Sequence, residues 1–116
     1  MKLTPTVFNC QVMVRAFHKR ALPPNIMFAD QLHKLVEEVG ELHRAHLKVD
    51  REGIVDALAD TLYVLLGLAN LAEVDLEKAF LAVHQSNMTK TRDGSLSPRG
   101  DAYQAPDLSG VDEEGS

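Results

Sequence analysis

Residues 28–48 read FADQLHKLVEEVGELHRAHLK, and their hydrophobic spacing decides the fold class. The apolar positions recur at intervals of three and four: Leu32, Leu35, Val36, Val39 and Leu42. This spacing is typical of an amphipathic α-helix with a single apolar stripe. We therefore expect a helix from about residue 28 to residue 48.

The segment before this helix predicts another one. Thr4 followed by Pro5 is a suitable N-cap and first helical residue, and the apolar spacing that follows predicts a helix to about Arg20. Pro23 and Pro24 remove two backbone donors, so the helix should end before them.

Two more helices are expected downstream. The first should span about residues 54–72, and because its second half is apolar nearly all round, it should be covered on two sides. Asp75 is a suitable N-cap for the second. The expected buried stripe of this last helix is Leu76, Ala79, Phe80 and Val83, continued by Asn87. The prediction is an all-α protein resembling a four-helix bundle.

Length and composition support this interpretation. A chain of 116 residues can bury one modest core, and 5% aromatic content without Trp suits packed helices better than sheets. Helical periodicity ends after Thr91, and the remaining sequence is rich in Gly, Pro, Ser and Asp. We expect one domain over residues 1–108 and a flexible tail over residues 109–116.

The charge and cysteine content narrow the cellular role. A net charge of -5 argues against nucleic-acid binding, which needs a surplus of Lys and Arg on one face. The longest apolar stretch, residues 61–72, is too short to span a bilayer. Cys10 is the sole cysteine, which favours a reducing compartment. The sequence thus predicts a cytoplasmic protein with neither nucleic acid nor membrane as partner.

Five acidic residues form the candidate site. Glu37, Glu38 and Glu41 lie within one turn of the second helix, where periodicity alone predicts a solvated face with Glu38 at its flank. Asp56 and Asp60 lie one turn apart on a helix side that becomes apolar, so partial burial is expected. Buried carboxylates without partners are costly, and basic neighbours are few. Mg²⁺, with Mn²⁺ as an alternative, is the expected counter-ion.

The run EEVGE at residues 37–41 resembles the EExxE signature of the MazG-like superfamily of all-α nucleoside triphosphate pyrophosphohydrolases. This superfamily is related to phosphoribosyl-ATP pyrophosphohydrolases and dimeric dUTPases. The second half of its signature is ExxD, whereas residues 56–60 read DALAD. Asp60 matches the Asp position, and Ala57 stands where the Glu would be. Asp56, one residue earlier, is a candidate replacement.

The resemblance implies hydrolysis of a nucleoside triphosphate to monophosphate and pyrophosphate, as house-cleaning of the nucleotide pool. Glu38, Glu41 and Asp60 would bind metal, assisted by Asp56. Glu37 is the first candidate for the base, although the roles of Glu37 and Glu38 are interchangeable. The metal would neutralise charge on the phosphate oxygens and activate water.

The resemblance also implies a substrate side and an assembly. Asn87 would contact the nucleotide and Lys90 its phosphates, whereas a helix C-cap and a dipole contact are the simpler structural roles for the two. A homodimer or homotetramer is expected. Phosphoribosyl-ATP hydrolysis and a non-catalytic module binding a basic partner are the alternatives. A di-iron bundle would need Glu-x-x-His, but Arg44 follows Glu41 at that spacing.

Overall fold

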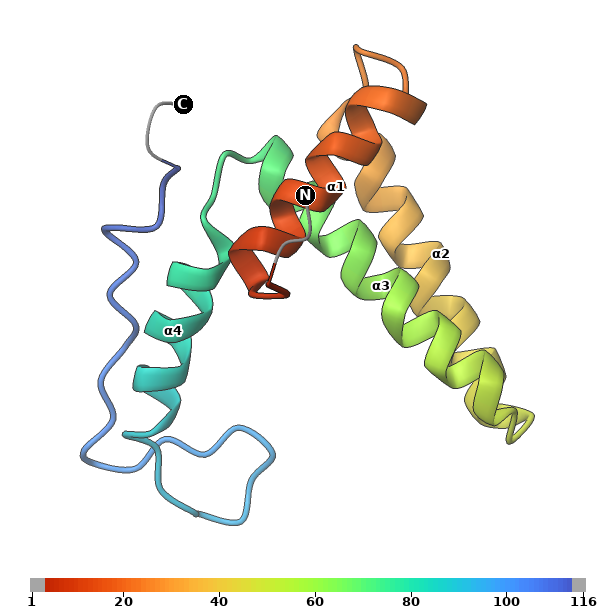
Figure 1. Ribbon diagram of the computed structural model, residues 1–116. Coiled ribbons are helices and arrows are strands. Elements are labelled where there is room, and N and C mark those ends of the chain that lie inside the picture. Colours follow the sequence, from red (N-terminus) through yellow and green to blue (C-terminus); the bar gives the residue numbers. More distant parts are fainter. Residues whose placement is uncertain (1–3, 114–116) are drawn as a thin grey trace.

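The computed structural model describes residues 4–113, and their secondary structure is helical, with an isolated bridge and no strand in that range. The four helices are α1 (Val7–Ala21), α2 (Phe28–Leu47), α3 (Arg51–Leu71) and α4 (Leu76–Asn87). Figure 1 shows α2 and α3 side by side. Helix α1 crosses them near the start of α2 and the end of α3, and α4 is set apart. The predicted all-α class and the four predicted helices are confirmed.

Side-chain caps set three of the helix starts. Thr6, not Thr4, caps α1, because its hydroxyl accepts a hydrogen bond from the Asn9 amide at 3.0 Å. Asp50 accepts from the Gly53 amide at 3.1 Å, which starts α3 three residues earlier than predicted. Asp75 caps α4 as predicted.

Helices α2 and α3 form a tight antiparallel hairpin. The side of α2 that becomes buried or half-buried carries Gln31, Leu35, Glu38, Leu42 and Ala45. The predicted apolar stripe is therefore only partly inside: Leu32, Val36 and Val39 keep exposed fractions of 42%, 66% and 49%. The prediction that Glu38 lies at the flank of a solvated face is wrong, because the hairpin seam runs through Glu38.

Helix α3 is the central helix, as predicted. Both α1 and α2 pack against it, and residues 66–69 are buried in its second half. By length and hydropathy alone, α3 would also qualify as a membrane span. Its position between two other helices, with Asp56 and Asp60 along its length, is that of a core helix in a folded domain.

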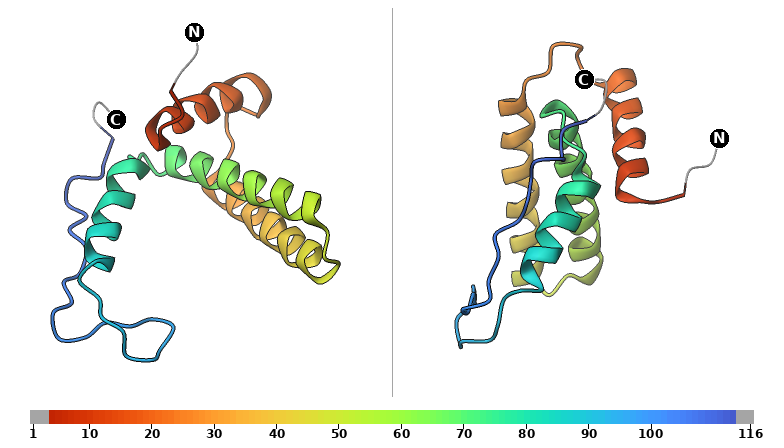
Figure 2. Two further views of the ribbon diagram at one scale, coloured as in Figure 1. Left: turned by 60° about the horizontal axis from the view of Figure 1, so that its bottom comes forward. Right: turned by 90° about the vertical axis from the view of Figure 1, so that its left-hand side faces the viewer.

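Helix α4 packs against α1, and the segment after it runs back along α4 (Figures 1 and 2). Ser86 donates to the Gln104 carbonyl at 2.6 Å, and the Asp75 amide donates to the Val111 carbonyl at 2.7 Å. The latter bond lies within the predicted tail. The boundary predicted at residue 108 stays a prediction, and residues 114–116 lie outside the described range.

The predicted buried stripe of α4 is wrong in its second half. Phe80 and Val83 keep exposed fractions of 61% and 40%, and Asn87 is exposed. Only α1 and the following segment cover α4, and they meet other sides of it. Ser86 is the buried residue of this helix.

The chain is more open than a compact domain of its size. Its radius of gyration is 16.7 Å, against about 13 Å expected for this length. The molecule has two arms: the α2–α3 hairpin, and α4 with the segment that follows it. Large apolar side chains remain exposed on both arms: Val36, Val39, Val55, Leu58, Leu62, Leu65, Phe80, Leu81, Val83 and Met88. Exposed apolar surface of this extent is unusual for a monomeric soluble protein.

Candidate active site

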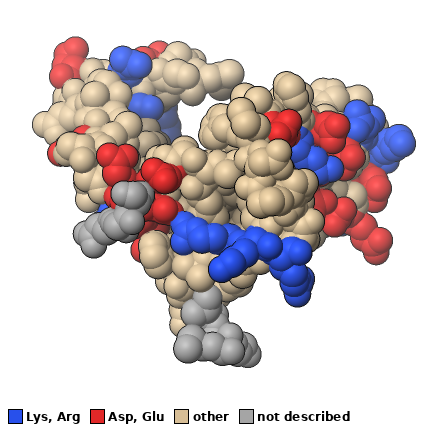
Figure 3. All heavy atoms as spheres, turned by 90° about the horizontal axis from the view of Figure 1, so that it is seen from above, with Lys and Arg blue, Asp and Glu red and all other residues tan. Residues whose placement is uncertain are grey.

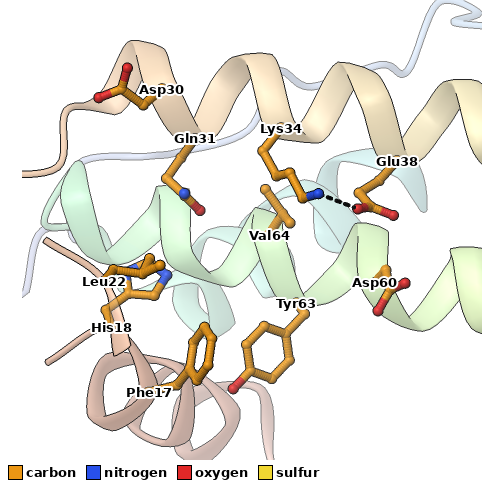
Figure 4. Close-up of a pocket in the computed structure, with 10 residues that line it drawn as sticks. All are labelled: Phe17, His18, Leu22, Asp30, Gln31, Lys34, Glu38, Asp60, Tyr63 and Val64. Carbon is orange, nitrogen blue, oxygen red and sulfur yellow. Dashed lines mark ion pairs between the residues drawn. The ribbon is translucent and has the colours of Figure 1, made fainter. Parts of the chain in front are cut away.

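A pocket of about 690 Å³ opens where α1 crosses the α2–α3 hairpin. Two of the predicted acids, Glu38 from α2 and Asp60 from α3, line it at one end (Figure 4). The remaining lining residues are Phe17, His18, Leu22, Asp30, Gln31, Lys34, Tyr63 and Val64. The structure thus brings acids from two neighbouring helices to one cavity.

Glu38 is the most buried of the five acids, with an exposed fraction of 5%. Its Oε1 lies 3.2 Å from the Lys34 ammonium, one helical turn away. Its Oε2 is buried and has no hydrogen-bond partner within the described residues. A buried carboxylate oxygen of this kind needs a donor or a cation, so this atom fits a bound divalent ion.

Asp60 lies half-buried beside this carboxylate. Burial raises the pKa of Asp60, and the negative charges of Asp56 and Glu38 raise it further. Lys34 acts in the opposite direction on this pKa. A negative charge on Asp60 is therefore disfavoured in this place, and a nearby cation would favour it.

The other predicted acids lie outside the pocket. Glu37 points away with a side chain 67% exposed, although its Oε2 is 3.6 Å from the Lys34 ammonium. Glu41 and Asp56 are exposed and line a separate recess of about 220 Å³ further along the hairpin, which buried Ala57 also lines. Figure 3 shows acidic and basic side chains interleaved on one side of the molecule.

As they stand, no three His, Cys, Asp or Glu side chains in residues 4–113 are grouped closely enough to hold a metal ion. Glu38 is turned toward Lys34, and like charges keep the uncompensated acids apart. A ligand set drawn from Glu38, Glu41, Asp56 and Asp60 therefore requires side-chain rotation on ion binding.

The side of the pocket where α1 meets α3 is aromatic, and sequence reasoning missed it. The rings of Phe17 and Tyr63 meet edge to face with centroids 5.6 Å apart. His18 lies against α3 where residue 67 is glycine, since a Cβ there would come within 2.6 Å of the imidazole. The periodic apolar spacing around Phe17 indicated only a buried helix face. The pocket thus combines carboxylates with an aromatic wall.

The predicted substrate residues do not reach this pocket in the same chain. Asn87 ends α4, and Lys90 follows one turn later, on the arm that Figure 1 shows pointing away from the hairpin. The Lys90 ammonium lies 5.8 Å from the Tyr103 ring centroid, and the Arg99 guanidinium lies 4.8 Å from it. The segment after α4 thus gathers two cations around one ring.

A helical hairpin whose carboxylates line a pocket is compatible with an all-α pyrophosphohydrolase. The sequence profile of the phosphoribosyl-ATP pyrophosphohydrolase family matches residues 15–87, more than half of the chain. The protein belongs to this family, and it is a hydrolase acting on a phosphoanhydride. Members of the family generally use divalent metal ions. Neither the curated proteins nor the solved structures compared with the chain include a significant match.

Proposed function

We propose that the protein is a Mg²⁺-dependent nucleoside triphosphate pyrophosphohydrolase that releases a nucleoside monophosphate and pyrophosphate, with Mn²⁺ as an alternative ion. The observation that carries this proposal is the pairing of Glu38 and Asp60 in one pocket, with the Glu38 Oε2 buried and unpartnered. Glu38, Glu41 and Asp60, assisted by Asp56, would hold the ion. When bound, the ion neutralises charge on the phosphate oxygens and makes water more acidic.

The chain's own residues supply binding and proton transfer. The edge-to-face pair of Phe17 and Tyr63 gives the nucleobase an apolar wall, and Val64 closes the floor. Glu37 is the candidate base on the family resemblance, and its exposed side chain would have to turn toward the pocket to take a proton from attacking water. Exchange of the Glu37 and Glu38 roles is the alternative.

The separation of α4 from the α2–α3 hairpin supports a proposal about the assembly. Asn87 and Lys90 cannot contact a nucleotide in the pocket of their own chain, because α4 and the hairpin diverge. We propose a homodimer or homotetramer in which a second copy's α4 covers the exposed apolar face of the hairpin. Asn87 and Lys90 of that copy would then approach the phosphates, in the cytoplasm, as part of nucleotide-pool house-cleaning.

Phosphoribosyl-ATP is the second candidate substrate, and the family match favours it. One screen separates the candidates: release of pyrophosphate from common and modified nucleoside triphosphates and from phosphoribosyl-ATP, with and without Mg²⁺, with the products identified. Asp60→Asn is the control. Mg²⁺-dependent conversion of a triphosphate to monophosphate, lost in the helical Asp60→Asn variant, supports the proposal. Conversion of phosphoribosyl-ATP alone contradicts it.

A further inference from the structure

Lys34 is the one basic side chain lining the acidic end of the pocket in the described residues. Its ammonium lies 3.2 Å from the Glu38 Oε1 and 3.6 Å from the Glu37 Oε2. Figure 4 shows it reaching along α2 toward Glu38, with Asp60 across the pocket. A positive charge therefore already occupies the neighbourhood proposed for the divalent ion.

The ion pair is asymmetric in burial. The Glu38 side chain is 6% exposed and packed in the hairpin seam, whereas the Lys34 side chain is 50% exposed. Glu38 therefore cannot leave the pocket without opening the hairpin. Lys34 can, because four rotatable carbons let its ammonium turn into the open pocket without a change in α2.

A divalent ion and the ammonium cannot both take the Glu38 carboxylate without strong mutual repulsion. The ion needs oxygen ligands, and Oε1 is the atom that Lys34 now holds. A nucleotide brings several phosphate oxygens into the same cavity, and an ammonium is a good point donor to them.

We propose that Lys34 is an exchangeable cation: it compensates Glu38 in the empty pocket, yields Glu38 to the divalent ion, and then contacts the phosphates of the bound nucleotide. This rests on the proposed function of the same pocket. Lys34 thus opposes binding of the ion alone and favours binding of the nucleotide. Removal of Lys34 should therefore strengthen ion binding and weaken nucleotide binding. Loss of a purely structural lysine would not change the two affinities in opposite directions.

The Lys34→Met variant tests both effects, on ion binding and on nucleotide binding. Mn²⁺ binding to the nucleotide-free protein, measured by electron paramagnetic resonance or calorimetry, should tighten about tenfold, because a competing unit charge has gone. The KM for the nucleotide should rise about tenfold with a smaller change in kcat, because a phosphate contact has gone. Lys34→Arg keeps the charge and should stay near the wild-type values for both.

Lys78→Met is the matched control, because it removes the same charge from an exposed position on α4, away from the hairpin. It should leave Mn²⁺ affinity unchanged. Circular dichroism verifies that each variant is helical. Unchanged or weaker Mn²⁺ binding in helical Lys34→Met overturns the proposal, even if the wild type hydrolyses nucleotides. A wild type that neither binds Mn²⁺ nor hydrolyses any nucleotide overturns the proposed function and the role of Lys34 together.

Discussion

The α2–α3 hairpin and α4 with its following segment differ in what they hold and in what they lack. The hairpin carries the acids Glu38 and Asp60 in a formed pocket but has no basic residue there except Lys34. The α4 arm carries Asn87, Lys90 and Arg99 but lines no pocket with them among the cavities found. Both arms expose apolar side chains. This difference supports the proposal made above that two copies complete one site.

Mixing two inactive variants would break or establish this division most clearly. Asp60→Asn and Lys90→Met should each lower kcat/KM at least about 100-fold. If the arms of different copies combine, random mixing of the two chains should restore about a quarter of wild-type activity, because half the dimers are mixed and each has one intact site. The measurement is pyrophosphate release after co-refolding.

The matched control for mixing is a pair of lesions on the same arm. Asn87→Ala mixed with Lys90→Met leaves one lesion in every composite site, so no activity should return. No restoration in the Asp60→Asn and Lys90→Met mixture would mean that each site is built within one chain. Restoration in the same-arm pair would mean that Asn87 and Lys90 do not serve the same site.

An exposed apolar residue on α4 sharpens the same comparison with a smaller effect. Phe80→Glu places a charge on a side chain that is 61% exposed in the single chain, so the monomer should stay helical. If another copy covers Phe80, the assembly should dissociate and activity should fall about tenfold. Light scattering after size exclusion measures the mass. Gln85→Glu, at an exposed polar position of α4, should leave both unchanged, whereas assembly of Phe80→Glu at wild-type strength would argue for another interface.

The smallest expected effect concerns the charge at Asp60. Because the pKa of Asp60 is raised in the folded state, ionisation of this group costs stability as the pH rises through its ordinary pKa of 3.8 and beyond. Metal-free Asp60→Asn should therefore melt slightly higher than the wild type at pH 7, by about 1–2 °C, with the gap closing below pH 4. Saturating Mg²⁺ should raise the melting temperature of the wild type only. A lower melting temperature for metal-free Asp60→Asn at pH 7 would contradict this.

The local features of the fold were predictable from the sequence, because capping and periodicity act over a few residues. Asp75 and the proline pair fixed helix boundaries in this way. The burial of Phe80 and Val83 was not predictable, because periodicity identifies an apolar face without saying whether the same chain or another covers it. The open shape of the single chain was unpredictable for the same reason.

Part of the candidate site was also predictable. The family signature identified Glu38 and Asp60, and the hairpin brings both to one pocket. Periodicity predicted the wrong surroundings for Glu38. The method takes apolar residues to mark the buried face of α2, but the buried face also contains this glutamate. The place of Lys34 in the pocket was not predicted. The contact between Phe17 and Tyr63 depends on how α1 crosses α3.

The central claim is that Glu38 and Asp60 share one divalent ion. Crystals grown with Mn²⁺ and a non-hydrolysable nucleoside triphosphate analogue test it directly through anomalous scattering. We expect an anomalous peak between the two carboxylates, with the phosphates of the analogue beside it. A peak elsewhere on the chain, or both carboxylates left without an ion while the analogue is bound, would contradict the account.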